Sequence, residues 1–231
     1  VGRGAGDRIL TSRMEVPPQV DWNQPGLFGR SATFRGTFES RVTVDENLRL
    51  PDQFTIEFWV YPKLTPALGC HQILMGTGRV NGSGPGIMRC HSPRLHGGWA
   101  VTQKKRADAS FDIVFLYLPG SGDQEYGKQR TRRIVGPLPI KANRWSHIAI
   151  ISTGQAFTMI TNGISEDHGN PVRIDNEHGQ NLTFGGYSGH PSGFFAGALD
   201  SVRISRRLRS VAELKDSYGR AREWLRSSLP H

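Results

Sequence analysis

The sequence predicts an all-β protein that ends in a single helix. Its 231 residues include 28 glycines and 14 prolines, with 36% hydrophobic residues, a composition typical of many turns and short strands. Short apolar runs follow one another between these turn signals. Helical spacing of apolar residues begins only after Ser210. An all-β chain of this length can form one domain.

The strands are predicted from runs rich in β-branched and aromatic residues. The clearest run is "FTIEFWVYP" at 54–62, in which apolar residues alternate with residues of the other face. Asn162 and Gly163 predict a tight turn, because both residues tolerate positive φ. Further strands are predicted within 31–34, 41–44, 72–76, 98–103, 111–118, 144–151, 157–161, 182–186 and 197–205, with a β-bulge near Asp200–Ser201.

The remaining segments frame these strands. Residues 1–25 are rich in Gly and Pro and predict an extended lead-in with little regular structure. Residues 210–231 predict a helix, because Ser210 and Glu213 form a capping box and apolar residues follow at helical spacing. This apolar stripe predicts that the helix docks on the domain, and a helix displayed for a partner is the alternative. Two long segments, 75–98 and 119–144, predict loops. Such loops either carry binding residues or only cover sheet edges.

Six segments in this order resemble one known family. They are "GLFGRSATFRG", "VTVDENLRLPDQFTIEFWVYP", "NRWSHIAII", "NGI", "LTFGGYSG" and "FFAGALDSVRISRRLRSVAEL". Together they resemble the laminin-G-like, concanavalin A-like lectin jelly-roll family, in its bacterial lectin/glucanase-like branch. The resemblance implies a two-sheet antiparallel jelly-roll sandwich over residues 26–209. It also implies carbohydrate or protein binding, generally without catalysis, and it identifies Trp59 and Trp145 as core residues first and ligand platforms second.

The resemblance also raises the question of calcium. An acid at the position of Asp200 often contributes to a structural calcium site in this family, together with an acid in a Phe-Asp-Gly stretch that here reads Phe34-Arg35-Gly36. Calcium prefers several oxygen ligands, so Arg35 argues against the ion. We therefore expect no cofactor, and a structural pair between Arg35 and Asp200. Calcium bound through Asp200 is the alternative.

The charge balance favours an anionic partner. The formal net charge is +9, which promotes association with acidic polysaccharide, nucleic acid or an anionic surface. Aromatic rings can stack on sugars while basic residues pair with acidic groups. Two sequence neighbourhoods combine these types, and the alternative for both is an ordinary solvated basic surface. The candidate ligand-binding residues are Trp99, Lys104, Lys105 and Arg106 in the first, and Tyr126, Arg130, Arg132 and Arg133 in the second.

These patterns favour binding over catalysis. Glu57 has no acidic partner at position 55 or 59, so the paired carboxylates of a glycosidase are not recognised. The leading hypothesis is a non-catalytic lectin-like module for a glycan or an anionic polysaccharide. An accessory domain that contacts other domains or subunits of a larger protein is the second hypothesis, and a diverged polysaccharide lyase is the third. Nucleic acid is disfavoured because no recognition motif is present.

The cysteines and the hydropathy bear on where the protein works. Cys70 and Cys90 are each followed by His, which leaves a disulfide, a zinc site and two unlinked thiols open. No apolar run is long enough for a transmembrane helix. We expect an extracellular or cell-surface location, although the chain begins without a signal peptide.

Overall fold

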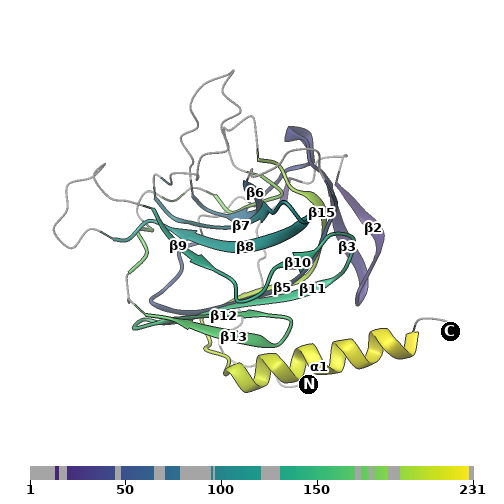
Figure 1. Cartoon of the computed structure of the whole chain (residues 1–231). Coiled ribbons are helices and arrows are strands. Elements are labelled where there is room, and N and C mark those ends of the chain that lie inside the picture. Colours follow the sequence, from purple (N-terminus) through teal and green to yellow (C-terminus); the bar gives the residue numbers. More distant parts are fainter. Residues whose placement is uncertain are drawn as a thin grey trace.

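Two antiparallel sheets and one helix make up the computed structural model (Figure 1). It describes residues 14–15, 20–44, 48–64, 71–78, 95, 97–120, 131–169, 173–176, 179, 181–186 and 193–228. Among these residues, no helix is long and apolar enough to cross a bilayer. The expected two-sheet antiparallel jelly-roll sandwich is confirmed.

The eight-stranded sheet runs in the order β1-β4-β14-β6-β7-β8-β10 over the described residues, with β9 also paired to β8. A 3-10 turn, Phe38–Ser40, precedes β4. The strands are β1 Met14–Glu15, β4 Val42–Val44, β6 His71–Gly76, β7 Trp99–Lys105, β8 Ser110–Tyr117, β9 Arg132–Val135, β10 Ile140–Lys141 and β14 Thr183–Phe184.

The seven-stranded sheet runs in the order β13-β12-β11-β5-β15-β3-β2 over the same described ranges. Strand β5 lies at its centre, paired with β11 on one side and with β15 on the other. The strands are β2 Asp21–Gly26, β3 Gly29–Arg35, β5 Gln53–Pro62, β11 Ser146–Thr153, β12 Phe157–Thr161, β13 Ile164–His168 and β15 Ala196–Ser205.

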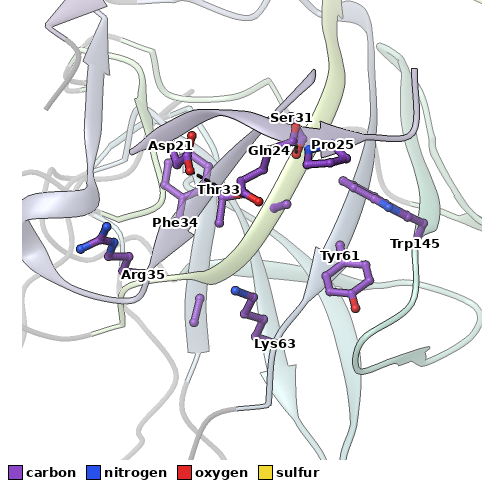
Figure 2. Close-up of a pocket in the computed structure, with 12 residues that line it drawn as sticks. Asp21, Gln24, Pro25, Ser31, Thr33, Phe34, Arg35, Tyr61, Lys63 and Trp145 are labelled. Atoms are coloured by element: carbon purple, nitrogen blue, oxygen red, sulfur yellow. Dashed lines mark hydrogen bonds between the residues drawn. The ribbon is translucent and has the colours of Figure 1, made fainter. Parts of the chain in front are cut away.

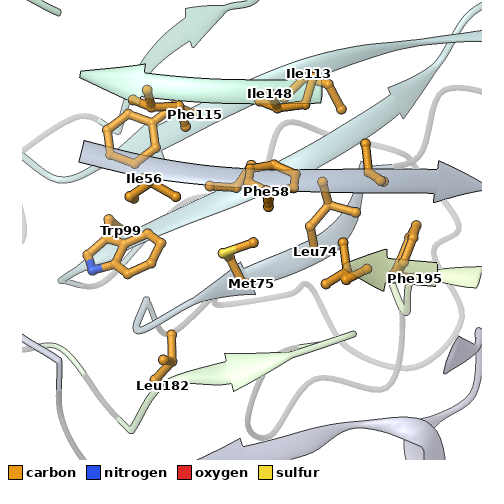
Figure 3. Packing of buried hydrophobic residues seen from close by; sticks show 14 of the residues in the cluster. Ile56, Phe58, Leu74, Met75, Trp99, Ile113, Phe115, Ile148, Leu182 and Phe195 are labelled. Atoms are coloured by element: carbon orange, nitrogen blue, oxygen red, sulfur yellow. The ribbon is translucent and has the colours of Figure 1, made fainter. Parts of the chain in front are cut away.

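Alternation along the strands creates the core between the sheets. In β5, Ile56 and Phe58 point inward and are fully buried, against Leu74 and Met75 of β6 and Trp99 of β7 (Figure 3). Successive side chains of a strand face opposite sides. The intervening residues of β5 therefore lie on the outer face of the seven-stranded sheet, where the helix and the candidate sites are found.

Helix α1, Val211–Ser228, covers part of that outer face (Figure 1). The capping box is present, since the Glu213 amide donates to Ser210 Oγ at 3.1 Å and the Ser210 amide donates to Glu213 Oε2 at 2.7 Å. Leu214 packs with Ala149, Ile151 and Ile160, and Ala221 packs with Leu27 and Trp59. The helix therefore packs against the outer face of the sheet through these apolar contacts.

Two expectations about irregular segments were wrong. Strands β1 and β2 lie in the segment predicted as a lead-in, and each is hydrogen-bonded to a neighbouring strand of a sheet. Strands β9 and β10 lie in the segment 119–144 that was predicted as a loop. In both cases sheet pairing provides backbone partners that Gly- and Pro-rich composition does not reveal.

Candidate functional site

A groove opens on the outer face of the seven-stranded sheet (Figure 2), and its described lining includes no residue of α1. Its volume is about 700 Å³, which lies within the ~300–1,000 Å³ typical of small-molecule sites. We call it the Tyr61 groove. It is lined by Asp21, Gln24, Pro25, Ser31, Thr33, Phe34, Arg35, Tyr61, Lys63, Trp145, Ala196 and Ala198.

Strand β5 supplies the aromatic side of the groove. Val60 points into the core, so its neighbour Tyr61 projects outward. Trp145 precedes β11, whose first residue Ser146 pairs with Val60, and this register places the indole beside Tyr61. The two ring centroids are 5.5 Å apart with an interplanar angle of 57°. Both rings remain partly exposed, so together they offer apolar surface to a ligand.

The floor of the groove is a row of residues that the sheet register brings together. Ala198 of β15 pairs with Tyr61 on one side and with Thr33 of β3 on the other, and Thr33 pairs with Asp21 of β2. A methyl group is the whole side chain of Ala198, so the row is low at its centre. The sheet therefore forms a hollow between the aromatic pair and the polar residues of β2 and β3.

The polar side of the groove carries both signs of charge. Arg35 and Lys63 are exposed at one end of the groove (Figure 2). Asp21 accepts a hydrogen bond from Gln24 Nε2 at 2.5 Å. Hydroxyl groups of a ligand can therefore form hydrogen bonds with a carboxylate, an amide and the Thr33 side chain. An acidic group of a ligand can form ion pairs with the two cations. Aromatic surface beside convergent polar groups is suited to binding.

Asp200 performs a different role from the one expected. It is buried, and its Oδ2 accepts the backbone amides of Leu27 at 2.6 Å and Phe28 at 3.0 Å. Its Oδ1 accepts the hydroxyl of Ser201 at 3.0 Å. The carboxylate therefore ties the β2–β3 turn to β15.

The expected pair between Arg35 and Asp200 is wrong. Arg35 pairs with Ala196 in the register of β3 and β15, four residues before Asp200, and its side chain is exposed in the Tyr61 groove. The Asp200 environment does not fit calcium either, because backbone N–H donors rather than further oxygen ligands face Oδ2. Within the described ranges, no three His, Cys, Asp or Glu side chains are grouped as metal ligands.

Most of the sequence-predicted ligand residues lie on the other sheet. Lys104 and Lys105 are on β7, Arg106 follows it, and Arg132 and Arg133 are on β9. Arg106 is engaged in an ion pair with Asp112 at 2.8 Å. Burial lowers the pKa of the His71 imidazole, and the positive charges of Lys104 and Arg133 lower it further. The role of these bases in binding stays a prediction.

Trp99 is not available as a stacking platform. Its side chain is fully buried in the core, and its ring centroid lies 6.3 Å from that of Phe115. Trp99 and Val101 share the inward face of β7, which explains the burial. Tyr126, Arg130, Cys70 and Cys90 lie outside the described residues.

Sequence reasoning missed most of the groove. It assigned packing first to both Trp59 and Trp145; Trp59 is indeed buried, but Trp145 is partly exposed and lines the groove. The alternation in "FTIEFWVYP" already placed Tyr61 on the face of Glu57, and this signal could have identified it. Thr33, Asp21 and Lys63 required knowledge of which strands are neighbours.

The fold and the groove define the chain as a β-sandwich domain of the jelly-roll class. A family profile for the Concanavalin A-like lectin/glucanases superfamily matches residues 35–215. The chain therefore belongs to this superfamily. No curated protein sequence matches the chain.

Solved structures with the same fold include domains of larger proteins. The binding domain of Paraclostridial Mosquitocidal Protein 1 has a TM-score of 0.59 and 17% identity, covering 90% of this chain and 47% of that one. The receptor binding domain of Botulinum Neurotoxin Type G has a TM-score of 0.59 and 16% identity, with 90% and 46% covered. The chain thus spans slightly less than half of each toxin domain.

A third similar structure contains a bound sugar. It is Domain 4 of AbnA, a GH43 extracellular arabinanase from Geobacillus stearothermophilus, in complex with arabinotriose. Its TM-score is 0.53 with 17% identity, and the match covers 84% of this chain and 78% of that domain. At such identities these likenesses show the shared fold.

Proposed function

We propose that the chain is a non-catalytic, carbohydrate-binding module whose ligand occupies the Tyr61 groove. The observation that carries this proposal is the pair of partly exposed rings, Tyr61 and Trp145, 5.5 Å apart beside polar side chains. Sugar rings present an apolar C–H face that packs on aromatic rings, while their hydroxyl groups need polar partners. Arg35 and Lys63 would favour a sugar that carries an acidic group.

The fold supports a binding role of this kind. The similar structures are binding or receptor-binding domains and a domain in complex with arabinotriose. We infer that this chain likewise serves as one part of a larger protein, and that it works outside the cell, as the arabinanase does. The lining of the groove has Asp21 as its single carboxylate, which does not meet the two-carboxylate requirement of glycoside hydrolysis.

The aromatic pair provides the first test. A glycan array of neutral and acidic oligosaccharides identifies a ligand, and calorimetric titration then measures its affinity for Tyr61→Ala and Trp145→Ala. We expect each variant to weaken binding about tenfold or more, equivalent to about 1.4 kcal/mol. Ile164→Ala removes an exposed apolar side chain from β13 and should leave the affinity unchanged.

The basic residues provide the second test. Lys63→Gln and Arg35→Gln should lower the affinity for an acidic ligand more than the affinity for a neutral one. The matched control is Lys215→Gln, on the exposed face of α1. Unchanged affinity in both aromatic variants would place the ligand elsewhere. No binding across the array would overturn the proposal in favour of an accessory domain that contacts other proteins.

A further inference from the structure

A second pocket lies between α1 and the β2–β3 turn, on the same outer face as the Tyr61 groove. Its volume is about 390 Å³. We call it the arginine pocket, because three arginines and one carboxylate contribute its charged lining. It is lined by Phe28, Glu57, Trp59, Ser201, Arg203, Arg209, Ser217, Arg220, Ala221 and Trp224.

Arg209 is a fixed part of this lining. Its guanidinium pairs with the carboxylate of Glu57 and donates to Ser217 Oγ at 2.8 Å and to the Glu213 carbonyl at 3.4 Å. The side chain is only 14% exposed. Glu57 is therefore neutralised by a partner within the lining, and the other two arginines add a net positive charge.

Arg203 and Arg220 are placed to receive an anion. Arg203 is exposed opposite Glu57 in the register of β15 and β5, and its guanidinium forms no hydrogen bond or close ion pair with any other described residue. Arg220 pairs with Asp216 one helical turn away, but both side chains are more than 60% exposed. Such surface pairs are weak, so an oxyanion in the pocket can compete for Arg220.

A strained bulge in β15 supports this arrangement. The register of β15 against β5 shifts between Asp200 and Arg203, and Ser201 within the shift has a φ of 49°. Positive φ is sterically unfavourable for a residue with a Cβ, and such strain often lies at functional sites. Here the bulge lets Asp200 hold the β2–β3 turn while Arg203 faces the pocket.

Aromatic surface lies beside these arginines. Phe28 is 50% exposed and Trp224 is 47% exposed, and their ring centroids are 5.9 Å apart. Guanidinium groups bind carboxylate and sulfate through paired N–H donors, whereas aromatic rings favour the apolar face of a sugar. A ligand that satisfies both features combines an oxyanion with an apolar ring face.

We propose that the arginine pocket is a second glycan-binding site, specific for a sugar that carries a carboxylate or sulfate group. Arg203 and Arg220 bind the oxyanion, and Trp224 packs on the sugar ring. Arg209, held by Glu57, keeps α1 and the sheet at the spacing that the ligand requires. This site does not depend on sugar binding in the Tyr61 groove.

The experiment titrates the full chain with a heparin-derived hexasaccharide, which carries sulfate and carboxylate groups, and with inorganic sulfate. The variant Arg203→Gln/Arg220→Gln should weaken hexasaccharide binding about tenfold or more at near-physiological salt. The control Arg206→Gln/Arg222→Gln removes two exposed arginines that do not line the pocket, so it has the same net charge. We expect the control to change affinity less than about twofold.

Equal losses of hexasaccharide affinity in the two double variants would overturn the proposal, because binding would then depend on net charge alone. Failure of the unaltered chain to bind the hexasaccharide would overturn it as well. Trp224→Ala should weaken the binding of the hexasaccharide but not the binding of inorganic sulfate. If Trp224→Ala changes neither affinity, the pocket does not recognise the sugar ring, and it is a site for a free oxyanion instead.

The two proposals can fail separately. Tyr61→Ala/Trp145→Ala should retain affinity in the arginine pocket, because neither residue lines it. Circular dichroism and thermal unfolding confirm that each variant is folded. Loss of hexasaccharide binding in this groove variant alone would assign the acidic ligand to the Tyr61 groove and contradict the second site.

Discussion

Nε2 of His147 donates a hydrogen bond to Oε1 of Glu57 across 3.0 Å, on the face of the sheet that α1 covers. His147 is fully buried, and the other carboxylate oxygen of Glu57 pairs with Arg209. Burial alone would raise the pKa of Glu57. The hydrogen bond from His147 and the positive charges of Arg209 and Arg203 oppose burial and hold that pKa below its ordinary value.

Glu57→Gln should therefore lower the free energy of unfolding at pH 7 by about 1–3 kcal/mol, because Arg209 loses its buried partner. A depressed carboxyl pKa contributes stability above the unfolded value of 4.5, and this contribution is lost as the pH falls through the lower folded value. The difference between the two proteins should shrink in acid. Urea unfolding from neutral to acidic pH measures it, with the exposed Glu166→Gln as control.

Asp200→Ala should be among the more destabilising substitutions, by about 2–4 kcal/mol, because the buried amide of Leu27 and the partly buried amide of Phe28 lose their acceptor. Asp200→Asn keeps one side-chain oxygen as an acceptor and should lower the free energy of unfolding less than Asp200→Ala does. Arg35→Gln should change stability by less than about 0.5 kcal/mol, since Arg35 is an exposed groove residue. A comparable loss in the Arg35 variant would restore the pairing that the structure rejects. Guanidinium unfolding of the three variants decides this.

Two glycines should respond to alanine in opposite directions. Gly197 has a φ of 152°, and a Cβ there would overlap the carbonyl oxygen of Tyr61. Gly197→Ala should therefore destabilise the chain by more than about 1 kcal/mol and weaken binding in the Tyr61 groove. Gly219 lies within α1 with nothing close to an added Cβ. Gly219→Ala should stabilise the chain by about 0.5–1 kcal/mol, and thermal unfolding compares the pair.

His71 should make stability depend on pH between about 4 and 6.5. Burial, with the charges of Lys104 and Arg133, lowers its pKa from 6.5 to about 4. The unfolded chain therefore takes up a proton in this range before the folded chain does. The contribution of His71 is complete above 6.5 and falls by about 3 kcal/mol as the pH drops to 4. In His71→Gln, the free energy of unfolding should depend less on pH between about 4 and 6.5, as measured by urea unfolding at several pH values. Parallel pH dependences of the two proteins would show that His71 is not the group responsible.

Local signals predicted the regular elements well where residue spacing decides the structure. The alternation at 54–62 gave β5, the capping box gave the start of α1, and Asn162 and Gly163, with φ of 51° and 82°, form the expected turn. The bulge between Asp200 and Arg203 was expected as well. Strands β2 and β9 were missed because pairing with neighbouring strands, rather than intrinsic preference, stabilises them.

The candidate sites could not be predicted to the same extent, because they depend on register between distant segments. Basic residues close in sequence, such as Lys104 and Lys105, drew attention to the eight-stranded sheet. The row that joins Tyr61, Ala198, Thr33 and Asp21 spans four strands and nearly 180 residues of sequence. No local pattern shows that these side chains are neighbours.

The carboxylate of Asp200 also holds a turn that borders both pockets. The turn that it holds connects β2, which gives Pro25 to the Tyr61 groove, to Phe28, which belongs to the arginine pocket. A displacement of this turn would reshape both cavities at once. A substitution at Asp200 is therefore expected to weaken binding in both pockets, even though the two pockets bind their ligands independently in the unaltered chain.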